Sequence, residues 1–193
     1  MARAKVRKAV NSRKISLAVA VAVAALAVRA LPSVAHADPT FGPNDIRTVF
    51  AVKKSENKNE VHYGIHLDAS CQPVGDEPVY AYWRDYEKGP DVVNDLGMLA
   101  KSAYGIKGQW VRKRSAEESK VLMSLKATPD RGILITTSRK DGKCVAEALA
   151  TINKEPALLQ QVFVHIAGFL SVDWIELRGF RLGKPSVERV MKK

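Results

Sequence analysis

The sequence lacks the short motifs that identify the large classes of nucleotide-dependent and hydrolytic enzymes. It has no phosphate-binding loop, no dinucleotide-binding fingerprint and no serine flanked by glycines at a strand-to-helix elbow. Neighbouring acids such as Asp85 and Glu87 lie in surface-like contexts and do not establish the carboxylate pair of a glycosidase. The sequence therefore assigns no catalytic residue and implies no cofactor.

Acidic residues are absent from the first 37 residues, which carry seven basic ones. Six of the basic residues precede an apolar run of 14 residues, 15–28, and residues 35–37 read Ala-His-Ala. This order is that of a secretory signal cleaved between Ala37 and Asp38. An uncleaved membrane anchor is the alternative, but a spanning helix needs about 20 apolar residues. We therefore expect export, to the periplasm or out of the cell.

Cysteine is scarce, because the chain of 193 residues has only Cys71 and Cys144. An even pair in an exported protein predicts a disulfide. The two cysteines are 73 positions apart, and a cross-link over such a loop is worth roughly 4 kcal/mol in the chain-entropy view. A reactive thiol is the alternative, but neither cysteine has the neighbouring cations or helix N-terminus that would lower its pKa.

Excess positive charge is confined to the two ends of the chain. The whole chain has 31 basic and 20 acidic residues, but beyond residue 37 the excess is only +4, and residues 180–193 account for all of it. A nucleic-acid-binding protein needs a basic face, so the sequence predicts no nucleic-acid partner. The strand pattern fades after residue 179. We therefore expect residues 180–193 to be a mobile basic tail, with weak contact to an anionic membrane surface.

Alternating apolar and polar residues dominate the chain beyond the signal. In 61–68, Val61, Tyr63, Ile65 and Leu67 alternate with polar or small residues, as in a half-buried strand. Similar patterns predict eight or nine strands, at 48–54, 61–68, 79–86, 109–113, 120–127, 133–138, 143–152, 160–167 and 172–177. Helical spacing of apolar residues occurs in 91–104, where Gly105 would end the helix.

The turns between these strands are short, whereas parallel pairing needs crossovers of about a dozen residues. We therefore predict a mainly β fold, in which residues 38–179 form a single domain with an antiparallel meander and one helix near 91–104. The strand spacing does not decide between a small barrel and a two-sheet sandwich.

His62 and His66 have the four-residue spacing that brings two zinc ligands together on a helix. On a strand this spacing spans about 13 Å, which is too far for one metal, so we predict no metal site. The polar face of the strand is instead a candidate ligand site. In a suitable register, His62 and His66 would lie beside Tyr82 and Arg84, which favour an anionic group and a flat contact surface. A slip of one residue would separate the two pairs and leave ordinary cross-strand contacts.

Three stretches of the sequence resemble a bacterial family of exported proteins. They are 53–65 (KKSENKNEVHYGI), 78–84 (PVYAYWR) and 103–106 (AYGI). The family is domain of unknown function 4833, and the resemblance covers residues 49–179. It implies a one-domain exported protein of unassigned activity, and it supplies no catalytic residues.

These observations together favour an exported, noncatalytic β-domain that binds a small anionic or amphipathic ligand or a protein partner in the cell envelope. Two alternatives stay open. One is a periplasmic hydrolase whose site is assembled from distant strands. The other is a structural or assembly protein of the envelope that uses sheet edges or the basic tail.

Overall fold

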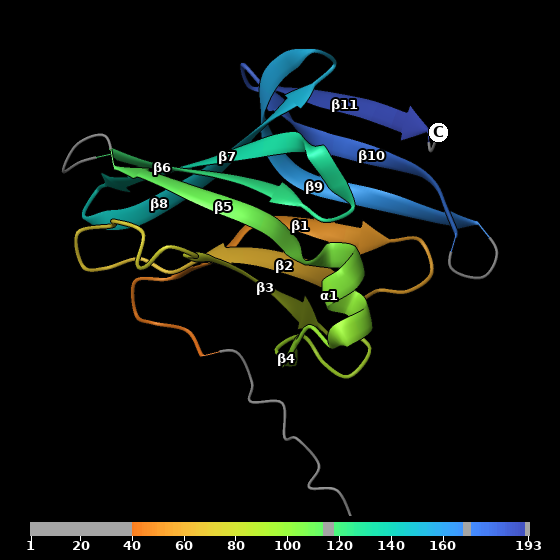
Figure 1. The fold of residues 1–193 in the computed structure, drawn as a ribbon, viewed down its shortest axis with the longest axis horizontal. Helices are drawn as coiled ribbons and strands as arrows, with labels where there is room; N and C mark the ends of the chain where they lie inside the picture. The colour runs from red at the N-terminus through yellow and green to blue at the C-terminus, as the bar shows by residue number, and fades with distance from the viewer. Residues whose placement is uncertain (1–39, 114–117, 168–170, 192–193) are drawn as a thin grey trace, which may run out of the picture. The chain divides into compact units, whose positions relative to one another are not determined.

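The computed structural model describes residues 40–113, 118–167 and 171–191 (Figure 1). The predicted signal, 1–37, and its cleavage site lie outside these residues. Within them the chain forms one helix, α1 (Met98–Tyr104), and eleven strands. The strands are β1 (Ile46–Lys54), β2 (Glu60–Ile65), β3 (Val79–Arg84), β4 (Val93–Asp95), β5 (Ile106–Lys113), β6 (Glu118–Leu125), β7 (Thr128–Lys140), β8 (Lys143–Ile152), β9 (Glu155–Ala167), β10 (Ser171–Arg181) and β11 (Lys184–Met191).

The mainly β class is confirmed, and each predicted strand segment overlaps an observed strand. These segments form strands because apolar and polar residues alternate in them, which gives each strand one face that water does not contact. In β2 the side chains of Val61, Tyr63 and Ile65 enter the core and are at most 1 % exposed. The same core receives Val121 and Met123 of β6, which are fully buried. One hydrophobic core therefore joins strands from both halves of the chain.

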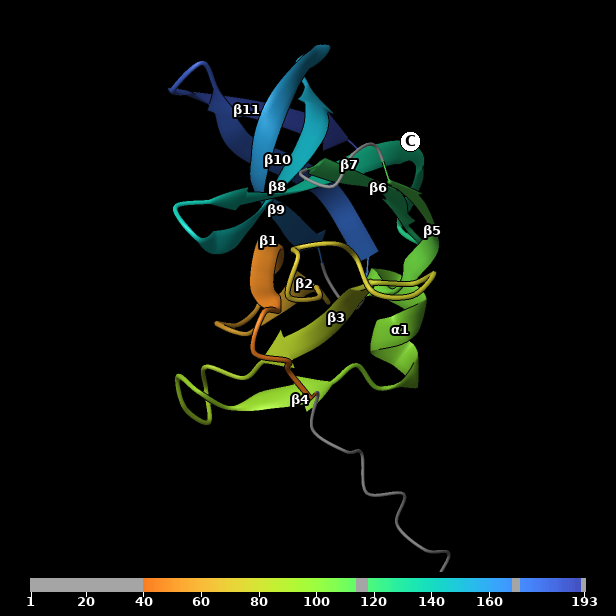
Figure 2. The same cartoon turned by 90° about the vertical axis from the view of Figure 1, so that its left-hand side faces the viewer.

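The strands form one mixed sheet, in the order β4-β3-β2-β1-β9-β8-β7-β6-β5, with the β10–β11 hairpin attached to β9. Figure 2 shows β4, β3, β2 and β1 following one another towards β9. The prediction of purely antiparallel pairing is wrong, because β1 and β9 run parallel, with Ala51 opposite Gln161 and Lys54 opposite Val164. A short turn requires antiparallel pairing only between strands that follow one another in the chain. β1 and β9 are instead joined by most of the domain, which is more than long enough for a parallel crossover.

The sheet is not closed into a barrel, because no ladder of hydrogen bonds joins its end strands β4 and β5 among the described residues. A side chain partly bridges the opening. The Gln109 amide of β5 accepts the Val79 N–H of β3 at 2.8 Å and donates to the Val79 carbonyl at 2.8 Å. The two halves of the sheet thus face each other across the core, which is broadly the arrangement of a sandwich.

The predicted helix, 91–104, is too long. Residues Val93–Asp95 form β4 instead and pair with β3, with Val93 opposite Arg84. Adjacent β-branched residues, Val92 and Val93, favour a strand where a partner edge is available. The helical part, α1, starts only after Gly97 and leaves Leu99 88 % exposed. Its end at Gly105 is as predicted, and a Cβ there would lie 2.2 Å from the Lys101 carbonyl oxygen.

The prediction of a mobile tail at 180–193 is also wrong for residues 180–191. Residues 184–191 form β11, which pairs with β10 over its whole length. Leu182 and Gly183 both have positive φ angles, 49° and 75°, which is the geometry of a tight hairpin turn. Two basic side chains of this segment are held by acids on neighbouring strands, because Arg189 contacts Glu176 at 3.1 Å and Arg181 contacts Glu155 at 3.5 Å. Residues 192–193 lie outside the described part of the chain.

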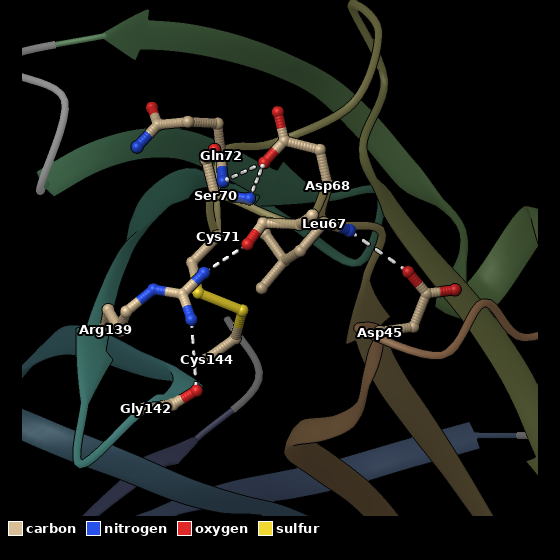
Figure 3. Close-up of a disulfide and its surroundings, with 10 residues drawn as sticks. Asp45, Leu67, Asp68, Ser70, Cys71, Gln72, Arg139, Gly142 and Cys144 are labelled. Atoms are coloured by element: carbon tan, nitrogen blue, oxygen red, sulfur yellow. Dashed lines mark hydrogen bonds between the residues drawn. A yellow bond between two sulfur atoms is a disulfide. The ribbon is translucent and has the colours of Figure 1, made fainter.

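The predicted disulfide between Cys71 and Cys144 is confirmed, with a Cα–Cα distance of 5.2 Å. It ties the loop after β2 to the start of β8 (Figure 3). Arg139 of β7 braces the same corner, because its guanidinium donates to the carbonyls of Ala69 and Gly142. None of the described residues belongs to a helix long and apolar enough to span a membrane.

Candidate functional site

The predicted polar patch lies on the outer face of β2 and β3. The two strands pair with His62 opposite Tyr82 and with Gly64 opposite Tyr80. Arg84 is two residues from Tyr82 on the same strand and therefore points to the same face. The observed register of β2 on β3 is thus the one that places His62, Tyr82 and Arg84 on the same face.

Both histidines of the patch are engaged by other side chains. His66 Nδ1 lies 2.8 Å from Asp45 Oδ2, and its ring stacks on Tyr80 with centroids 4.2 Å apart. Burial raises the pKa of Asp45, but hydrogen bonds from Gly42 N–H, His66 and Leu67 N–H outweigh burial and hold that pKa below its usual value. His66 therefore fastens the segment before β1 to the end of β2.

His62 lies in a chain of three polar side chains. Its Nδ1 is 2.8 Å from Thr48 Oγ1, and its Nε2 is 3.1 Å from Glu60 Oε2. Burial lowers the pKa of His62, the Glu60 carboxylate opposes this shift, and Arg84 adds to the lowering. The imidazole is therefore neutral near pH 7. An Nε2–H that donates to Glu60 leaves the Nδ1 lone pair to accept the Thr48 hydroxyl proton.

Tyr82 and Arg84 line a hollow of about 250 Å³ together with Phe41, Arg47, Asp91 and Val93. The Phe41 ring covers Tyr82, with centroids 5.2 Å apart. His62 and His66 do not line this hollow. The structure therefore brings the four predicted residues onto one face but divides them between a hydrogen-bonded layer and a small cavity. Ligand binding by these residues stays a prediction.

A much larger cavity, of about 800 Å³, lies on the opposite, inner face of the sheet. Its walls are mostly aliphatic and come from strands distant in sequence, with Val52 on β1, Val162 and Val164 on β9, and Leu177 on β10. Trp174 and Val190 line it from the β10–β11 hairpin. Because residues 180–193 were expected to be a tail, neither this wall nor the cavity that it completes was predicted from the sequence.

Small residues leave part of this space open. Buried Ala150 of β8 lines the interior, and the lining also includes Ala103, Ala127 and Gly132, which are exposed. On β8 the inward positions are Ala146, Ala148 and Ala150, whereas Leu149 lies on the other face. A strand that carries its small residues inward and a leucine outward is the signal that could have indicated a cavity.

Charged side chains at one side of the cavity hold its strands together. Arg131 of β7 contacts Glu188 of β11 at 3.0 Å, and Glu188 also accepts the Asn153 N–H at 2.9 Å. The Arg131 guanidinium is the main cause that keeps the pKa of Glu188 below its usual value. Lys154 and Asp130 line the same cavity and add one charge of each sign. The cavity is thus apolar inside, with polar groups of balanced charge at one side.

The described residues contain no group of three or more histidine, cysteine, aspartate or glutamate side chains placed to hold a metal ion. The chemistry that the geometry offers is therefore of two kinds. The inner cavity can enclose an apolar body with a polar end. The Thr48–His62–Glu60 chain can withdraw a proton from a hydroxyl.

No curated protein and no solved structure matches this chain. A family model, described as a domain of unknown function (DUF4833), matches residues 50–189. The matched range begins in β1 and ends in β11, so it includes the strands that form the cavity and the hairpin that was expected to be a tail. The chain therefore belongs to the family of domain of unknown function 4833.

Proposed function

We propose that this domain is an exported binding module that holds a small amphipathic molecule in the inner cavity. The observation that supports the proposal best is the cavity volume of about 800 Å³, lined mostly by apolar side chains. Ligand pockets usually measure about 300–1,000 Å³ and combine apolar walls with a few polar groups. The proposal includes export, as the basic and apolar N-terminal segment predicts.

The energetics of packing favour an occupant. An apolar void forfeits the contacts that its lining would otherwise make, so an apolar ligand gains by entering it. Thr128, Thr151 and Lys154 offer hydrogen-bond donors to a polar end group. Charges of both signs among the lining residues do not select an acidic or a basic end group. An apolar body with one hydrogen-bonding end is therefore the ligand class that fits.

Filling the cavity tests this proposal. We expect Ala150→Phe to weaken binding of the apolar fluorophore 1-anilinonaphthalene-8-sulfonate by about tenfold or more, because the new ring occupies the ligand's volume. Leu149→Phe on the outer face of the same strand adds an aromatic ring without entering the cavity and is the matched control. Fluorescence titration measures both affinities. Equal affinities in the two variants and the wild type would contradict the cavity as the binding site.

A natural ligand can be sought directly. Native mass spectrometry of protein purified from its own host, followed by organic extraction, would show any molecule retained in the cavity. A retained amphipathic molecule that is absent from Ala150→Phe supports the proposal. Retention by both proteins would place that molecule elsewhere.

A second candidate function, ester hydrolysis, is favoured by the Thr48–His62–Glu60 chain. In such a reaction the Thr48 oxygen attacks the acyl carbon while its proton passes to His62 Nδ1. That proton then goes to the departing alcohol, and water releases the acid from Thr48. Glu60 would hold the imidazole in the required tautomer, through the 3.1 Å contact with Nε2.

Hydrolysis of p-nitrophenyl acetate tests this candidate. We expect Thr48→Val and His62→Asn each to reduce any wild-type rate by about 100-fold or more, since both remove the proton transfer. His66→Asn is the control, because His66 contacts Asp45 and lies outside the chain. Wild-type rates in Thr48→Val would exclude Thr48 as the nucleophile.

A further inference from the structure

The hollow over β3 and β4 lies on the opposite face of the sheet from the inner cavity. Arg84 reaches it from β3, Val93 from the paired position on β4, and Arg47 from β1. Its volume of about 250 Å³ is below the usual range for drug-sized ligands. Whatever enters it is therefore small and does not compete with a ligand of the inner cavity.

Two guanidinium groups line this hollow. Arg84 donates through Nη2 to the Pro90 carbonyl at 2.7 Å, but its buried Nε has no hydrogen-bond partner among the described residues. The Arg47 guanidinium lies 4.7 Å from the centre of the Phe41 ring and forms no ion pair within the described part of the chain. Asp91 brings the single carboxylate among the described lining residues. The hollow therefore carries a net positive charge, and one of its arginines has a buried donor without a partner among the described residues.

An unsatisfied buried N–H is costly, and an acceptor that reached it after a small shift of the Arg84 side chain would remove that cost. Arginine binds carboxylate and phosphate oxygens through a rigid fork of N–H groups. The half-buried Phe41 ring, which packs edge-on against the buried Tyr82 with centroids 5.2 Å apart, offers apolar contact next to this fork. The chemistry of the hollow thus matches an anionic group attached to a small flat body.

We propose that Arg84 and Arg47 form a second binding site, which takes a small organic anion with its carboxylate or phosphate on the two guanidinium groups and its apolar part against Phe41 and Tyr82. This inference goes beyond the proposed function, because it rests on other residues on the other face of the sheet. Binding here would also place an anion close to His62, whose pKa Arg84 helps to lower.

The experiment uses the full mature chain with benzoate and phenyl phosphate as probes, measured by calorimetry and by the NMR signal of the Arg84 Nε–H. We expect saturable binding of at least one probe, a shift of that signal, and about tenfold or greater weakening in Arg47→Gln and Arg84→Gln. The probe that binds more tightly identifies the anionic group. Arg112→Gln removes an exposed charge from β5, as Arg47→Gln does from β1, and should bind like the wild type.

Arg84→Lys covers the case in which Arg84→Gln fails to fold. Lysine retains the charge but lacks the fork and the Nε–H, so its affinity should also fall. Arg47 is exposed, and Arg47→Gln should retain the fold. Absence of saturable binding by the wild type, or equal loss in Arg112→Gln and Arg47→Gln, would overturn the proposal.

Discussion

Replacing both Cys71 and Cys144 with alanine is expected to lower the free energy of unfolding by about 4 kcal/mol. The disulfide closes a loop over a sequence separation of 73 residues, so its removal greatly increases the conformational freedom of the unfolded chain. Native contacts change less, because Arg139 still holds the Ala69 carbonyl across the same corner. Denaturation in urea, monitored by tryptophan fluorescence, measures the loss.

The wild-type protein with its disulfide chemically reduced is the control for this variant. It lacks the same cross-link, so its free energy of unfolding should match that of the double variant to within about 1 kcal/mol. A double variant as stable as the oxidised wild type would contradict the expected contribution.

Replacing Tyr63 with alanine is expected to cost about 4 kcal/mol of stability. The Tyr63 ring is fully buried and stacks on Phe50 with centroids 4.4 Å apart. Its hydroxyl donates to the Tyr104 carbonyl at 2.6 Å, which ties β2 to the end of α1. Truncation removes the ring from the centre of the core and enlarges the cavity that Tyr63 also lines. The shift of the urea midpoint, with the slope unchanged, reports this loss.

Tyr63→Phe separates the ring from the hydroxyl. It keeps the stacked ring but leaves the Tyr104 carbonyl without its donor, and we expect it to cost about 1 kcal/mol. Equal losses in the phenylalanine and alanine variants would mean that the hydroxyl, and not the packing of the ring, provides the stability.

Local sequence pattern predicted the features that depend on one strand and its neighbour. The alternation of Val61, Tyr63 and Ile65 identified β2 and its buried face, because every second side chain of a strand points the same way. The same logic placed His62 and Tyr82 on one face. Since only one cysteine pair exists, the disulfide also followed from composition.

Features that depend on distant pairing could not be predicted in this way. β11 has apolar residues on both faces, with Val187 pointing outward and Val190 into the cavity, so it shows no simple alternation. The short strand β4 exists because β3 offers it an edge, whereas the helical spacing of the apolar residues in 91–104 predicted a helix there. The Thr48–His62–Glu60 chain needed both the register of β1 on β2 and the bulge between Ile46 and Phe50.

The parallel pair of β1 and β9 determines the order in which this domain can fold. Ala51 pairs with Gln161, so the centre of the sheet joins residues 110 positions apart. Contacts between residues so far apart in sequence form slowly, because the chain loses the entropy of closing the loop before the contacts stabilise it. Until β9 has been synthesised, one edge of β1 has no partner. The centre of the sheet is therefore completed late, and a partly synthesised chain exposes at β1 the kind of open strand edge that invites aggregation.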